Sequence, residues 1–246
     1  MIITVGFTQI PQAMCLVPYQ ALVGSLNHSA VMTHPNILKA IQSVAQFLSN
    51  PGCKHWNATL QIVKYLNTTK DWILMFGGKS SDSIPKAIAY CNVDFANSQD
   101  HGHLISVYAL MLNIGCFLWC SKKQTATATS THELEYYSSV NSGHEILWIC
   151  QLLLELHFKQ PSSTPLHIKN TLFLHTLNAP DQVTNHTKHI NVTYHWIKDE
   201  VQKQVIHPVF VPSDQNAADI FTKPFLTPCH KELCRMLGMG PQDGAY

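Results

Sequence analysis

The chain has 246 residues, of which 46% are hydrophobic and 13% are charged. This length and apolar content predict a globular protein, with either one large domain or one ordinary domain and a smaller one. Because the formal net charge is only +1, the composition gives no general reason to expect a polyanionic partner, and any nucleic-acid contact must come from local lysine clusters.

The first third of the sequence has the periodicity of amphipathic helices. Apolar residues within 35–50 recur at spacings of three and four, and Pro35 is placed to open this helix. A cluster of turn residues at 77–85 then marks the expected end of a small helical unit. In chain order, we expect helices at about Tyr19–Ser29, 35–50 and 53–67 and a short strand at 71–76.

Beyond the turn cluster the pattern changes to short apolar strands. Three strands, a long helical region, and then alternating strands and helices predict an α/β domain with a mixed sheet. The long helical region is expected to break at Asn141–Gly143, because these residue types favour turns. The expected strands are 86–94, 106–112, 115–120, 166–170 and 205–212, and the expected helices are 131–157, 187–203 and 216–223.

Cysteine and histidine spacing gives no sign of a zinc site or a disulfide framework. None of the eight cysteines forms a Cys-x-x-Cys pair, which favours reduced thiols in an intracellular protein, cytoplasmic or nuclear. The densest histidine group, His186, His189 and His195, matches no compact zinc pattern. We expect neither a signal peptide nor a membrane span, since the start lacks a basic lead and the longest apolar runs are short or interrupted.

The stretch Ser-Thr-His-Glu-Leu-Glu-Tyr-Tyr, residues 130–137, places two glutamates at an expected helix start. Ser130 and Glu133 have the spacing of a capping box, which gives Glu133 a local structural task. Glu135 lies about 200° around the helix from Glu133, so it does not share that face and is free for another role.

Several ordered blocks resemble the ribonuclease H region of copia-type retrotransposon Pol polyproteins. Residues 121–157 resemble the family segment in which Ser-Lys-Lys-Gln leads to Ser-Ser-Thr-Glu-Ala-Glu-Tyr and a Trp-Leu-rich helix. Residues 187–201 and 210–225 resemble its Thr-Lys-His-Ile-Asp and Ala-Asp-Ile-Leu-Thr-Lys-Pro-Leu blocks. Upstream segments resemble the region after the reverse-transcriptase palm, and the likeness runs collinearly from about Val17 to Leu237.

This resemblance implies a ribonuclease H-like mixed sheet flanked by helices, preceded by a small helical reverse-transcriptase remnant. The implied parts are the remnant at 1–80, the ribonuclease H-like domain at 84–224 and a C-terminal tail at 225–246. The Tyr-x-Asp-Asp motif of the polymerase site does not occur in the sequence, so we expect no DNA synthesis by this chain alone. Departures from the family pattern indicate a degenerate copy.

In the resembling nucleases, four carboxylates hold two divalent metals, Mg²⁺ or Mn²⁺, because hard cations need anionic oxygen ligands. Glu135 matches the helix glutamate of the family, and Asp219 matches its final aspartate. The first position is ambiguous between Asn92 and Asp94, since the family has Asp-Ala-Asp where this chain has Asn92-Val93-Asp94. We take Asn92 as the matching residue and Asp94 as the fallback.

The third carboxylate position departs from the family, because Lys169 precedes Asn170 where the family has an aspartate. A lysine supplies no metal oxygen, and its ammonium repels a divalent ion. We therefore expect that no metal is bound and that cleavage is impaired, with the lysine lying among Glu135, Asp219 and Asp94. The plain alternative is an exposed lysine at a strand end without bearing on function.

Contact with nucleic acid is expected at Lys122, Lys123, Lys188 and His189, unless these are ordinary solvated residues. Three functions remain open at this point. The chain is a ribonuclease H-like domain with a defective site, a nuclease still active on RNA–DNA hybrids through Asp94, Glu135 and Asp219, or a non-catalytic nucleic-acid-binding remnant. Its expected partners are an RNA–DNA hybrid and the remainder of the Pol polyprotein.

Overall fold

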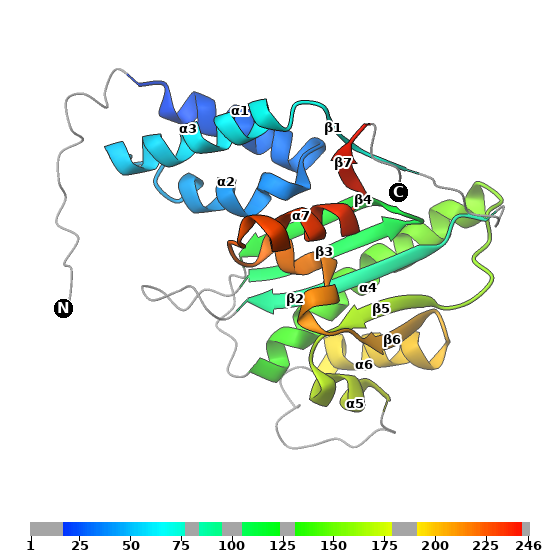
Figure 1. Cartoon of the computed structure of the whole chain (residues 1–246). Helices are drawn as coiled ribbons and strands as arrows, with labels where there is room; N and C mark the ends of the chain where they lie inside the picture. Colours follow the sequence, from blue (N-terminus) through cyan, green and yellow to red (C-terminus); the bar gives the residue numbers. More distant parts are fainter. Residues whose placement is uncertain (1–16, 77–83, 95–104, 124–130, 179–190, 243–246) are drawn as a thin grey trace. The chain divides into compact units, whose positions relative to one another are not determined.

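The protein is represented by a computed structural model, which describes residues 17–76, 84–94, 105–123, 131–178 and 191–242 (Figure 1). Within these ranges, the side chains of residues 94, 123, 131–134 and 191–194 are not described. The chain forms two compact units, residues 1–71 and 72–246. The boundaries expected from the family resemblance, at residues 80, 84 and 224, stay a prediction. They mark which part of a Pol polyprotein each segment matches, and a division into compact units does not test that.

The first unit consists of helices near the expected positions, but the helix expected at 35–50 begins as a 3₁₀-helix and ends at Ala45. They are α1 (Tyr19–Met32), the 3₁₀-helix η2 (Pro35–Ile37), α2 (Leu38–Ala45) and α3 (Cys53–Thr68). Their buried residues include Val23, Leu26, Ile41 and Ile62. The hydroxyl of Tyr19 donates to the carbonyl oxygen of Val44 at 2.7 Å, which ties α1 to the end of α2.

The second unit is built on a five-stranded sheet in the order β4-β3-β2-β5-β6. The strands β2 and β3 pair antiparallel, as do β3 and β4, whereas β5 pairs parallel with both β2 and β6. The strands are β2 (Ala87–Asp94), β3 (Ile105–Leu112), β4 (Gly115–Lys123), β5 (Thr164–Ile168) and β6 (Ile206–Phe210). The sheet is therefore mixed, and the expected α/β class with a mixed sheet flanked by helices is confirmed.

The long helix α4 (Thr131–Glu155) is continuous, so the expected break at Asn141–Gly143 is wrong. Its small residues serve close packing. A Cβ atom added at Gly143 would lie 3.0 Å from side-chain atoms of Ile197 and Trp196 on α6 (Asn191–Gln202). The hydroxyl of the buried Ser142 finds its hydrogen-bond partner within the helix, since it donates to the carbonyl oxygen of Ser138 at 2.8 Å.

Helix α4 packs against β2 and β3 and forms the main core of the second unit. On β2, the residues Ala87, Ala89 and Cys91 face this core. Because side chains alternate along a strand, Asn92 points to the opposite face of the sheet. The 3₁₀-helix η5 (Ala217–Phe221) contacts β2 and β3, and it is drawn in orange in front of β2 in Figure 1.

Several described elements were not expected from the sequence. Helix α5 (Thr171–Asn178) and the 3₁₀-helix η4 (Ser213–Gln215) were missed, as were α7 (Thr227–Met236) and β7 (Met239–Pro241). The last strand pairs antiparallel with β1 (Trp72–Leu74), so the end of the described chain is part of the fold of the second unit. Among the described helices, none combines the length and apolar character that crossing a membrane requires.

Candidate functional site

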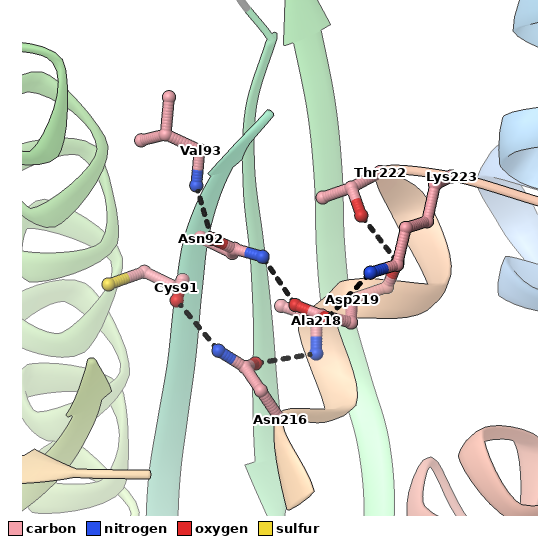
Figure 2. A network of polar contacts seen from close by, with 8 residues as sticks. All are labelled: Cys91, Asn92, Val93, Asn216, Ala218, Asp219, Thr222 and Lys223. Atoms are coloured by element: carbon pink, nitrogen blue, oxygen red, sulfur yellow. Dashed lines mark hydrogen bonds and ion pairs between the residues drawn. The ribbon is translucent and has the colours of Figure 1, made fainter. Parts of the chain in front are cut away.

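The side chain of Asn92 lies in the interior, between the central strand β2 and the 3₁₀-helix η5 (Figure 2). It is 7% exposed, and its Nδ2 atom donates a hydrogen bond to Oδ1 of Asp219. Its own Oδ1 accepts from the backbone N–H of Val93 at 2.8 Å. The oxygen and the nitrogen of the Asn92 amide therefore both have hydrogen-bond partners. Because the oxygen accepts from Val93, the nitrogen is the atom that faces Asp219.

Asp219 lies within η5 and is 1% exposed. Its Oδ2 atom lies 4.0 Å from Nζ of Lys223, one turn further along the chain. The hydroxyl of Thr222 donates to the backbone carbonyl oxygen of Asp219 at 2.8 Å. The buried carboxylate thus receives one N–H from Asn92 and the charge of an exposed lysine at longer range.

Asn216 makes a second connection between η5 and β2. Its Nδ2 donates to the carbonyl oxygen of Cys91 at 3.1 Å, and its Oδ1 accepts from the backbone N–H of Ala218 at 3.0 Å. The second bond caps the N-terminus of η5. Two neighbouring residues of β2 are therefore bonded to two side chains of one short helical turn (Figure 2).

Glu135 lies near the start of α4 and is partly buried. Burial raises its pKa from the ordinary value of 4.5 to about 7, while a hydrogen bond with Asn170 and the charge of Lys169 act in the lowering direction. Asn170 itself accepts the backbone N–H of Phe173 at 3.1 Å, which helps to start α5. The Lys169 side chain is exposed at the end of β5.

The predicted site residues thus form two described groups. Asn92 contacts Asp219, and Glu135 interacts with Lys169 and Asn170. Asp94 is the last residue of β2, but its side chain lies outside the described part of the structure. The same holds for the side chains of Lys123 and Glu133. Ser130, Lys188 and His189 lie wholly outside the described residues. Lys122 is exposed near the end of β4. Within the described ranges, no group of three or more His, Cys, Asp or Glu side chains could hold a metal ion.

Two residues at this site were missed in the sequence. Asn216 precedes a short helix and has the residue type of an N-cap, so its capping role had a local signal. Lys223 follows Asp219 by four residues, the spacing at which helical side chains meet, although the short helix made this signal weak. The bond from Asn216 to Cys91 had no signal, because 125 residues separate the partners.

No protein-family model matches the chain. It is 35% identical over 230 residues to "Retrovirus-related Pol polyprotein from transposon TNT 1-94" of Nicotiana tabacum, which covers 91% of this chain and 16% of that protein. It is 31% identical over 221 residues to "Retrovirus-related Pol polyprotein from transposon RE2" of Arabidopsis thaliana, covering 90% of this chain and 15% of that protein. The chain spans about a sixth of the length of these relatives.

Among solved structures, the chain is similar to an RNase H1 isolated from compost by a metagenomic approach. The TM-score is 0.43 and the sequence identity is 14%, and the match covers 55% of this chain and 91% of that one.

Proposed function

Because the chain belongs to the family of retrotransposon Pol polyproteins, we propose that its second unit is a ribonuclease H-like domain that no longer cleaves RNA in RNA–DNA hybrids. The proposal assigns Glu135, Asp219 and either Asn92 or Asp94 to a vestigial metal site, with Lys169 at the position of a lost aspartate. In the family the metal would be Mg²⁺ or Mn²⁺, which activates water and stabilises the leaving oxygen.

The observation that carries the proposal is the position of Lys169, directly after β5 and beside Asn170, where its charge acts on Glu135. At a two-metal site, carboxylates coexist because the cations compensate their charge. Here the ammonium group of Lys169 acts on the carboxylate of Glu135 and supplies no ligand oxygen. The residues present therefore place an ammonium group, and not a ligand oxygen, beside Glu135, and they do not fit two divalent metals.

Asn92 supports the same conclusion from the other side of the site. The N–H group of Asn92 donates to Oδ1 of Asp219, so one oxygen of the carboxylate that would hold a metal is already bonded to the protein. If Asn92 stands at the first ligand position, one of the four family carboxylates is replaced by a neutral amide whose N–H faces Asp219, and another by a lysine, which has no ligand oxygen. The fallback, Asp94, would leave Lys169 as the single replaced ligand.

A cleavage assay tests the proposal directly. The natural chain and an Asn92→Asp/Lys169→Asp variant are incubated with a labelled RNA–DNA hybrid in Mg²⁺ or Mn²⁺. We expect no cleavage by the natural chain and cleavage by the double variant. Lys159→Asp is the matched control for the charge change, because this exposed lysine precedes β5 whereas Lys169 follows it.

Cleavage by the natural chain would refute the proposal and would favour the active nuclease that uses Asp94. Hybrid binding without cleavage, weakened as salt rises, would assign a binding role to exposed lysines such as Lys122. The same binding measurement with Lys122→Ala tests that role, and Lys188 and His189 are the further candidates.

A further inference from the structure

We propose that Asn92 and Asp219 form an amide–carboxylate latch that holds η5 against the central strand without a metal ion. The hydrogen bond itself is independent of the proposed function. Only the interpretation of Asn92 and Asp219 as residues at former metal-ligand positions rests on the proposed function. The latch explains how a carboxylate that is 1% exposed remains compatible with a folded interior.

The orientation of the amide is the first argument. Asn92 receives the N–H of Val93 on its oxygen and presents its N–H to Asp219. Because both residues are buried, each polar atom left without a partner would cost stability. An aspartate at position 92 would still accept from Val93, but its second oxygen would then face Oδ1 of Asp219, acceptor against acceptor. Such a pair needs a proton or a cation between the two carboxylates.

The second argument is the weakness of η5 on its own. The element spans only Ala217–Phe221, and 3₁₀-helices of this length have poor hydrogen-bond geometry. Its place on the sheet depends on outside contacts. These include the packing of its buried residues against β2, β3 and α7, the bond from Asn216 to Cys91 and the bond from Asn92 to Asp219. Of these, the Asn92 bond involves a charged partner, the stronger class of hydrogen bond.

The test compares thermal unfolding of full-length variants in EDTA and in Mg²⁺. We expect the natural chain to melt at the same temperature in both. Asn92→Asp should lower the melting temperature in EDTA by roughly 5–10 °C, with part of the loss recovered in Mg²⁺. Asn141→Asp, the same chemical change at an exposed position of α4, should leave the melting temperature unchanged.

The exchanged variant, Asn92→Asp/Asp219→Asn, tests the hydrogen bond most directly. It places the carboxylate on β2 and the amide on η5, so one N–H···O bond can form again with the same two side-chain shapes. We expect it to regain most of the loss caused by Asn92→Asp. If the exchanged variant is no more stable than Asn92→Asp, or if Mg²⁺ stabilises the natural chain as much as it stabilises Asn92→Asp, the latch is refuted.

Hydrogen exchange gives a local measurement if Asn92→Asp fails to fold. The backbone N–H groups of Val93 and Ala218 are bonded to Asn92 and Asn216. Asp219→Leu, which removes the acceptor of the Asn92 N–H, should speed exchange at these two amides relative to the natural chain, and unchanged exchange would contradict the latch. Hybrid cleavage by the natural chain would overturn the proposed loss of catalysis but would leave this exchange result standing, so the two failures are distinguishable.

Discussion

The raised pKa of Glu135 predicts that the stability of the protein falls as pH rises between about 4.5 and about 7. In the unfolded chain this carboxyl ionises near its ordinary value of 4.5, whereas in the folded protein burial holds it protonated until about pH 7. Below this window the group is neutral in both states and causes no loss. Above the window it is ionised in both states, and the full loss is present.

The magnitude follows from the two pKa values. At about 1.36 kcal/mol for each pH unit between them, a rise from 4.5 to about 7 corresponds to a loss of roughly 3 kcal/mol in the free energy of unfolding. Because Glu135 is partly buried, solvent screens this penalty only in part. The neutral isostere Glu135→Gln removes the ionisation and keeps the shape of the side chain.

Urea unfolding of the natural chain and of Glu135→Gln, followed from about pH 4 to about pH 8, measures the effect. We expect near-equal free energies at the acid end and a more stable Gln variant, by about 3 kcal/mol, at the alkaline end. Glu155→Gln is the matched control on the same helix, since Glu155 is exposed. A difference between the natural chain and Glu135→Gln that is the same at every pH would refute the reasoning.

The role of Lys169 can be read in the same experiment. Its charge lowers the pKa of Glu135 against the effect of burial. Lys169→Met should therefore raise that pKa further, so the loss of stability should grow and extend to higher pH. If the pH dependence of stability does not change, the charge of Lys169 does not act on Glu135. The observation on which the proposed function depends would then be contradicted.

Two further predictions concern glycines that permit close packing. Gly143→Leu should destabilise the second unit by about 1–3 kcal/mol in urea unfolding, because side-chain atoms of Ile197 and Trp196 lie 3.0 Å from where a Cβ would stand. The exposed Asn141→Leu is its control on α4, and equal stability of the two variants would contradict the packing role. Gly238→Ala should lower the melting temperature, because Gly238 has a φ of 78° and an added Cβ would lie 2.5 Å from the carbonyl oxygen of Ile114. An unchanged melting temperature would show that this backbone approach can relax.

The helices of the first unit and the strands of the second were predictable because each buries one face, and periodicity records that directly. The false break in α4 shows where local signals fail. Asn141-Ser142-Gly143 has the composition of a turn, yet Gly143 is small because α6 packs against it. The distinction between a turn glycine and a packing glycine depends on a contact with residues more than fifty positions away, which periodicity does not record.

At the site too, the sequence predicts what depends on neighbouring residues and does not predict contacts between residues far apart in the chain. Asn92 and Asp94 stand two residues apart on one strand, so alternation places them on the same face and cannot choose between them. The fold adds the contact of Asn92 with Asp219, whose partners are 127 residues apart. The assignment of family ligand positions stays a prediction, since it depends on aligned motifs as well as on geometry.

The residues at positions 92 and 169 have the same physical effect, because each brings an N–H donor or a positive charge to a buried or partly buried carboxyl group. A buried carboxylate needs a proton, an N–H donor or a cation nearby. Asn92 supplies an N–H to Asp219, whereas Glu135 keeps its proton until about pH 7 and Lys169 offsets only part of the effect of burial, so neither remaining carboxyl group depends on a metal ion. Reverting either position alone would add a negative charge beside an existing one without completing a metal site. If Asn92 stands at the first ligand position, activity is therefore expected only when both aspartates return together. In EDTA the double reversion carries both repulsions, so it should be the least stable form and the one that Mg²⁺ stabilises most.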